Sequence, residues 1–204
     1  MIHPVVIDVH LPAGLAGLEP MDFDVRCFLV PHPTGLTLVD TGLDHSTPAI
    51  TGKLAEIGAD WGDVTDVILT HDHPDHAGGL STVLALAPGA AFWAGPLDPL
   101  PVPARAAEDG CMIRGLRVIA TPGHTAGHLS LLSEQNGALL LGDLAGTPQG
   151  RLVRAPAPFT ADAAEAERSL HKTSRLDFTD LYPSHGGPTD RHALQQLLTA
   201  PATA

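Results

Sequence analysis

A chain of 204 residues, of which 44% are apolar, is long enough to bury a core and lacks the composition of a disordered protein. Acidic residues outnumber basic ones by 23 to 11, and the formal charge of −12 disfavours nucleic acids and anionic membranes as partners. We therefore expect one domain, residues 1–204, with neither nucleic acid nor a membrane as its partner.

Strands and helices are mixed along the chain. In chain order, the sequence predicts strands over 5–11, 24–30 and 36–39, a helix over 48–57, a strand over 64–70, a helix over 78–86, strands over 90–94, 116–120, 128–133 and 138–141, a helix over 161–173, a strand over 180–183 and a helix over 191–198. Two proline-rich segments, 95–110 and 147–158, are predicted loops. Two packed sheets with helices outside them would bury the apolar strands on both faces.

Cysteine usage and the N-terminal sequence bear on the compartment. The two cysteines, Cys27 and Cys111, form no C-x-x-C pair, and a reduced compartment is the simpler interpretation. The first residues lack the basic and apolar regions of a signal peptide, and no apolar stretch is long enough to span a bilayer. We expect a cytoplasmic protein, and the sequence leaves its oligomeric state open.

Ligand-type side chains are concentrated directly after the strand predicted over 64–70. His71 and His73 are two residues apart in an extended stretch, so their side chains project the same way and can bind one metal. Asp75 and His76 follow where the chain turns toward the next helix and can face a second metal. Such a density of histidine and aspartate is improbable for a solvated loop and is typical of sites for zinc, iron or manganese.

Three more ligand-type residues follow later predicted strands. His124 comes after the strand over 116–120, Asp143 after the strand over 138–141, and His185 after the strand over 180–183. Each stands beside glycine, which lets the backbone approach closely. Each signal is weak when taken singly, but together they converge on one site.

The motifs H-x-H-x-D-H, G-H-T, G-D and S-H-G, preceded by Val-Asp-Thr-Gly at 39–42, resemble the metallo-β-lactamase superfamily from about residue 39 to residue 187. The resemblance implies an α/β fold, an αββα sandwich of two mixed β-sheets with helices on the outer faces and metals along one edge. It places the first metal on His71, His73 and His124, the second on Asp75, His76 and His185, and a bridging carboxylate at Asp143.

Two further residues match positions outside the ligand set. Asp40 matches the aspartate that helps to orient the metal-binding loop in this superfamily. For His128, the resemblance leaves open whether the residue supports the ligands or is purely structural. The proline-rich segments 95–110 and 147–158 are either walls of the substrate pocket or plain connecting loops.

Two divalent ions, with zinc favoured and iron or manganese as alternatives, would share a hydroxide of pKa about 7. The predicted activity is therefore hydrolysis of a small carboxylic ester, thioester or lactone, as in members that resemble glyoxalase II or lactonases. Glyoxalase II enzymes carry a further C-terminal domain, whereas this chain ends soon after His185, so that particular activity is doubtful. True β-lactamases lack a carboxylate at the position of Asp143, and the acidic charge disfavours the RNA-processing members.

A rival interpretation is an oxygenase. Persulfide dioxygenases share the H-x-H-x-D-H motif and use one iron, for which His71, His124 and Asp143 would form a facial triad. The motif alone does not separate this reaction from two-metal hydrolysis. A protein that binds metal without turnover is a third class, ranked last because no ligand is missing.

Overall fold

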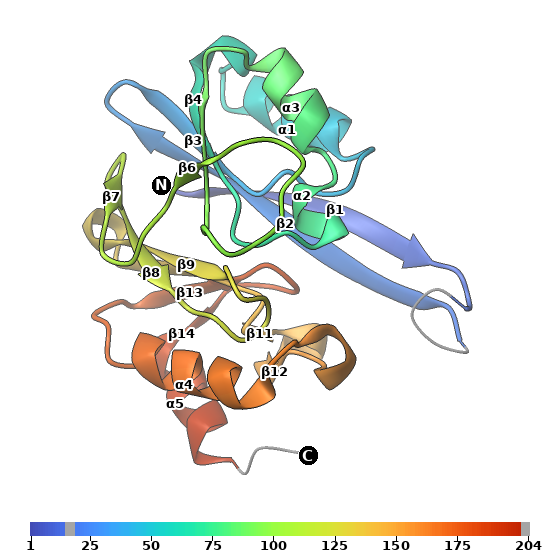
Figure 1. The fold of residues 1–204 in the computed structure, drawn as a ribbon, viewed down its shortest axis with the longest axis vertical. Coiled ribbons are helices and arrows are strands. Elements are labelled where there is room, and N and C mark those ends of the chain that lie inside the picture. Colours follow the sequence, from blue (N-terminus) through green and yellow to red (C-terminus); the bar gives the residue numbers. More distant parts are fainter. Residues whose placement is uncertain (15–18, 201–204) are drawn as a thin grey trace.

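Two β-sheets packed face to face form the centre of the molecule, and helices cover both outer faces (Figure 1). The computed structural model describes residues 1–14 and 19–200. Its layers follow the order helix, sheet, sheet, helix, which confirms the αββα sandwich that the sequence predicts.

Each of the two large sheets has six strands. The spatial order in the first is β1 (His3–Leu11), β2 (Met21–His32), β3 (Gly35–Val39), β4 (Val64–Ile68), β5 (Ala91–Ala94) and β6 (Arg105–Ala106). The order in the second is β14 (Thr189–Asp190), β13 (Asp180–Pro183), β10 (Ala138–Gly142), β9 (Leu129–Ser133), β8 (Leu116–Ala120) and β7 (Met112–Ile113). A separate two-stranded sheet pairs β11 (Ala145–Gly146) with β12 (Val153–Arg154).

The helices divide between the two outer faces. The first sheet is covered by α1 (Thr47–Glu56) and α3 (Leu80–Leu86), and the second by α4 (Ala163–Thr173) and α5 (Arg191–Thr199) (Figure 1). A single-turn helix, α2 (Pro74–Ala77), lies between β4 and α3 in the chain. In the described part of the chain, no helix combines the length and apolar character needed to cross a bilayer.

Three apolar layers hold the sandwich together, because successive strand residues point to opposite faces. Ile50 of α1 packs with the outer residues of the first sheet. Leu131 of β9 lies between the sheets, whereas the adjacent Leu132 packs with Leu170 of α4 and Leu194 of α5 on the outer side. All five side chains are buried, so both sheets bury both faces.

The topology brings several strand ends to one edge of the sandwich. Strands β3 and β4 are parallel in the first sheet. In the second sheet, β8 and β10 are both antiparallel to β9, and β13 is parallel to β10, so these three strands also share a direction. Every predicted metal ligand follows the carboxyl end of β4, β8, β10 or β13.

Each predicted element is present within three residues of its expected ends, but several details differ. Strand β4 ends at Ile68 rather than at residue 70, because the N–H of Thr70 donates to the Asp40 carboxylate (2.7 Å) instead of to a strand. Asp75 and His76 lie within helix α2 rather than in a turn. The segments 95–110 and 147–158 are not pure loops, since each contains a two-residue strand (β6 and β12) that has no detectable sequence period.

Candidate metal centre

The seven predicted ligands lie together at the shared edge. Their potential ligand atoms fall into three overlapping groups, and within each group the atoms lie within 4.8 Å of one another. The first group is His71, His73 and His124, and the second is Asp75, His76 and His185. The third set, His71, His76 and Asp143, connects the two. The structure thus brings together the residues that the sequence assigns to two metals.

The first group is an arrangement of three imidazoles. The ring centroids of His71 and His73 are 4.7 Å apart, and that of His124 is 4.8 Å from the first and 4.6 Å from the second. Nε2 of His124 faces Nδ1 of His73 at 2.9 Å. Two ring nitrogens from separate loops are therefore directed at one small volume, as a shared cation would require.

Asp143 lies between the first and second groups. Its Oδ2 atom is 3.0 Å from Nε2 of His185, 3.4 Å from Nε2 of His76, 3.5 Å from Nε2 of His124 and 3.9 Å from Nε2 of His71. One carboxylate oxygen thus faces imidazoles of both groups. Asp75 completes the second group, with its Oδ2 3.5 Å from Nε2 of His185.

Unsatisfied polar atoms in this cluster show that its donor set fits divalent metals. Nε2 of His71, Nε2 of His76 and Oδ1 of Asp143 are buried and make no hydrogen bond within residues 1–14 and 19–200. Buried polar atoms without partners are costly and rare in folded proteins. Imidazole nitrogens and carboxylate oxygens are the ligands that zinc and similar ions take, so bound cations would satisfy these atoms.

Asp40 fixes the orientation of two candidate ligands. Its carboxylate, fully buried at the end of β3, accepts from Nδ1 of His76 (2.9 Å) and from Oγ1 of Thr70 (2.9 Å). Because that hydroxyl donates to Asp40, it accepts from Nδ1 of His71 (3.0 Å). Because Nδ1 of each imidazole donates to these partners, Nε2 is the ring atom that faces the cluster, and Asp40 occupies the orienting position that the sequence predicts.

His185 and Asp143 are oriented in the same way by other partners. Nδ1 of His185 donates to the backbone carbonyl of Asp24 on β2 (2.7 Å), which leaves Nε2 for the cluster. His128 donates from Nδ1 to the carbonyl of Thr121 (3.0 Å), and its Nε2 accepts from the N–H of Asp143 (3.0 Å). His128 therefore holds the backbone of Asp143 and is a positioning residue rather than a member of the ligand cluster.

The electrostatics of the cluster follow from burial and from the close carboxylates. Although burial opposes charge on His76, Asp143 and Asp40 raise its pKa well above the usual value. Burial would raise the pKa of Asp143, but His76 lowers it well below the usual range. Burial lowers the pKa of His71 well below its usual value and that of His124 to about 4. A divalent cation would displace the proton on His76, so metal binding competes with protonation.

An open cavity of about 400 Å³ adjoins the first group. It touches His73, His124 and Asp72, and its walls come from 97–99 and 158–161. These walls belong to or border the two proline-rich segments, which supports their interpretation as pocket walls. A larger cavity of about 490 Å³ lies between α3 and residues 102–105 and touches none of the ligand cluster, so we assign no chemistry to it.

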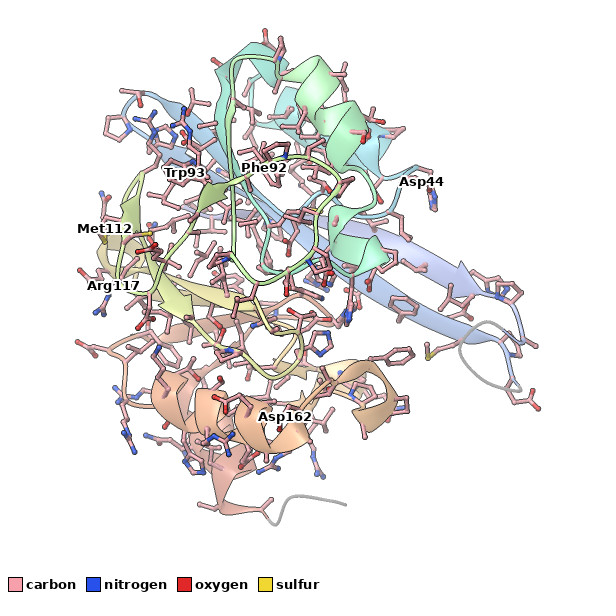
Figure 2. All side chains as sticks on the ribbon, viewed as in Figure 1. Asp44, Phe92, Trp93, Met112, Arg117 and Asp162 are labelled. Carbon is pink, nitrogen blue, oxygen red and sulfur yellow. The ribbon has the colours of Figure 1, made fainter. Side chains whose placement is uncertain are left out.

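Hydrogen bonds connect the cavity walls to the loop that carries His124. The Asp98 carboxylate accepts from Oγ1 of Thr125 (2.8 Å) and from the N–H of Gly127 (2.6 Å). On the other side, the N–H of Asp162, labelled at the start of α4 in Figure 2, donates to the carbonyl of Gly123 (2.8 Å). The pocket and the first group therefore form one connected unit.

The sequence reasoning missed four supporting residues, Asp24, Thr70, Asp98 and Thr121. Thr70 alone carried a usable signal, since it directly precedes the H-x-H motif with a side-chain hydroxyl. Asp24 and Asp98 contact ligand loops that are distant in sequence. Asp24 and Thr121 act through backbone carbonyls, which no residue type reveals.

The model of the metallo-beta-lactamase superfamily matches residues 21–185, and the chain belongs to this superfamily. Members of this superfamily bind divalent metals and are mostly metal-dependent hydrolases. The chain is similar to hydroxyacylglutathione hydrolase of Aeromonas hydrophila, at 30% identity over 193 residues that cover 86% of this chain and 70% of that protein.

Solved structures share the fold at lower identity. The metallo-beta-lactamase family protein TTHA1429 from Thermus thermophilus has a TM-score of 0.71 at 23% identity, with 96% of this chain and 78% of that chain covered. The structure of TTHA1623 in a di-iron-bound form has a TM-score of 0.71 at 24% identity, with 94% and 98% covered. These likenesses establish the sandwich fold.

Proposed function

We propose that this chain hydrolyses a small carboxylic ester, thioester or lactone at a two-metal centre, with zinc favoured and iron or manganese as alternatives. His71, His73 and His124 would hold one ion, and Asp75, His76 and His185 the other. The observation that carries the proposal is the position of Asp143, whose Oδ2 lies 3.0–3.9 Å from imidazoles of both groups. A carboxylate in that position is suited to bridge two cations.

Two bound cations would polarise the substrate carbonyl and lower the pKa of water to about 7. The protein contributes fixed ligand orientations, because Asp40, Asp24 and His128 hold the ligands before substrate arrives. Asp75 has a side chain that is 22% exposed, whereas that of Asp143 is 8% exposed. A carboxylate oxygen of Asp75 is therefore placed to accept the proton released by the attacking water and to exchange it with solvent.

The relatives support a carbonyl-hydrolysing activity. Hydroxyacylglutathione hydrolase, as its name states, cleaves an acyl derivative of glutathione, and it matches 86% of this chain. The di-iron form of a protein with the same fold supports iron as an alternative to zinc. A cavity of about 400 Å³ beside the cluster supports a small-molecule substrate.

The rival reaction, a mononuclear iron oxygenase, would give a role to fewer of the clustered residues. Its iron would use His71, His124 and Asp143 and would leave His76 without a function. Nε2 of His76 is buried, makes no hydrogen bond in the described part of the chain and is held toward the cluster by Asp40. A second cation would satisfy this atom, whereas a single iron held by His71, His124 and Asp143 would leave it without a partner.

The test is metal-dependent turnover of a panel of neutral thioesters, aryl esters and lactones. Chelation should abolish hydrolysis, and zinc, manganese or iron(II) should restore it. His124→Ala should lower kcat/KM by at least about a hundredfold. The matched control is His171→Ala, which removes an exposed histidine of α4 outside the cluster and should leave kcat/KM unchanged. Chelator-resistant hydrolysis, or oxygen consumption with glutathione persulfide and no hydrolysis, would overturn the proposal.

A further inference from the structure

Half of the residues that line the cavity beside the cluster are apolar. Its walls include Leu97, Pro99, Ala126, Pro158 and Phe159, which come from three separate segments of the chain. His73 and His124 form its floor on the side of the metal ligands. A substrate whose carbonyl is held at the ligand cluster can therefore extend directly into this cavity.

Two of the large exposed apolar side chains of the described residues stand in these walls. Leu97 is 69% exposed and Phe159 is 42% exposed, on different segments. Apolar side chains left in water beside a reactive centre are favourable contacts for an apolar ligand, because the ligand removes their surface from water. The cavity thus favours a hydrocarbon chain or ring.

The charges around the cavity oppose an anionic substrate. Apart from the two histidines, the ionisable residues that line it in the described part of the chain are Asp72 and Asp98, with no lysine or arginine. Residues 15–18 and 201–204 contain no lysine or arginine in the sequence either. Two of the chain's cations are paired elsewhere, Arg154 with Glu167 and Lys172 with Asp109.

A substrate carboxylate that extends into this cavity, away from the metal ligands, would lose water and find no lysine or arginine among the described residues that line it. The Asp98 carboxylate accepts hydrogen bonds from Thr125 and Gly127 and so stabilises the cavity wall. To a ligand it adds only negative charge. Like charges at close range disfavour binding, most of all in a partly desolvated site.

We infer that the cavity binds an uncharged apolar chain, so that the preferred substrates are neutral esters, thioesters or lactones with an aliphatic or aromatic group. This inference rests on the proposed function and names its substrate class. Glutathione thioesters, which carry two carboxylates, are disfavoured despite the similarity to hydroxyacylglutathione hydrolase. Phe159 and Leu97 are the residues that determine this specificity.

Four matched thioesters test the inference in the purified, metal-loaded protein. Hexanoyl-N-acetylcysteamine is the neutral reference, and acetyl-N-acetylcysteamine lacks most of its chain. Adipoyl-N-acetylcysteamine adds a terminal carboxylate to the acyl group, and hexanoyl-glutathione adds charge to the thiol. We expect kcat/KM for the reference to exceed each of the other three by about tenfold or more.

Variants separate the cavity from the metals. Phe159→Ala and Leu97→Ala should lower kcat/KM for the hexanoyl substrate about fivefold through KM and affect the acetyl substrate less. Leu97→Lys should shift the preference toward the adipoyl substrate. Leu86→Ala removes another exposed leucine, 43% exposed on α3 and outside the cavity, and should change nothing.

The outcomes distinguish this inference from the proposed function. Hydrolysis with equal or better rates for the adipoyl or glutathione substrates refutes the inference alone. No metal-dependent hydrolysis of any of the four, nor of the aryl esters and lactones in the panel that tests the proposed function, refutes both. Broadening of the methyl NMR signal of hexanamide by the protein gives a readout without turnover, and an equal effect from Phe159→Ala would also refute the inference.

Discussion

Asp40→Asn isolates the orienting role of one buried carboxylate. Asp40 has a φ angle of +61°, a left-handed conformation that asparagine also tolerates, so the backbone need not change. The variant keeps the shape of the side chain but replaces one acceptor oxygen by an NH₂ group. That group cannot accept from Nδ1 of His76 and from Thr70 as the carboxylate does.

The expected loss of metal affinity in Asp40→Asn follows from the lost hydrogen-bond acceptor. If the amide NH₂ faces His76, the imidazole must accept at Nδ1 and carry its proton on Nε2, which then cannot bind a cation. A hydrogen bond to a charged group contributes about 2 kcal/mol, which corresponds to roughly 30-fold weaker metal binding. This value falls within the range of about 10–100-fold typical for partners of metal ligands. The affinity for the second metal, which His76 would hold, should fall the most.

The assay is competitive metal titration of the chelator-treated protein with a fluorescent zinc indicator, together with urea unfolding. Asp66→Asn is the matched control, because Asp66 is also a buried aspartate and accepts from Trp93 and Arg114 away from the cluster. It should lower the free energy of unfolding by about 1–3 kcal/mol and leave metal affinity unchanged. Metal affinity within threefold of wild type in Asp40→Asn would refute the orienting role.

Two more predictions concern stability. Burial lowers the pKa of His128 to about 3. Below the ordinary histidine pKa of about 6.5, the unfolded chain therefore binds a proton that the folded chain does not. The free energy of unfolding should fall by about 2 kcal/mol between pH 7 and pH 5 for this reason. Urea unfolding in excess chelator should show a loss of stability between pH 7 and pH 5 that is about 2 kcal/mol smaller in His128→Gln than in wild type. Parallel pH profiles of the two proteins would contradict this assignment. A Cβ at Gly95 would collide with the carbonyl oxygen of Gly127, so Gly95→Ala should destabilise the protein by about 1–3 kcal/mol. Gly52 lies in the middle of α1, and a Cβ there would have no atom within 4 Å, so Gly52→Ala should stabilise the protein by about 0.5–1 kcal/mol. Equal effects of the two substitutions on urea unfolding would count against the close contact at Gly95.

The parts of the site that the sequence predicted are those encoded by spacing. His71 and His73 are two residues apart after a strand with a clear apolar pattern, so their common direction follows from local geometry. Asp143 and His185 follow β10 and β13, and any sheet that makes these strands parallel neighbours brings the two together. The apolar strands favoured two packed sheets, but the αββα sandwich itself was predicted from the resemblance to the superfamily and not from the order of the strands.

The supporting contacts depend on the tertiary fold and could not be predicted from the sequence. Asp98 holds the loop of Thr125 from a proline-rich segment whose path no periodicity defines. The carbonyl of Asp24 orients His185 across 161 positions in the sequence, and a backbone group carries no residue signature. The short helix that contains Asp75 has too few residues to show a helical pattern.

The most direct test of the two-metal centre is elemental analysis of the protein purified without added metal, in wild type and in Asp143→Asn. We predict about two equivalents of divalent metal per wild-type chain. Removing one carboxylate charge between the two groups should weaken both sites, so the variant should retain less than one equivalent. Circular dichroism verifies that the variant is folded. A single equivalent of iron in wild type, or an unchanged metal content in Asp143→Asn, would contradict the account.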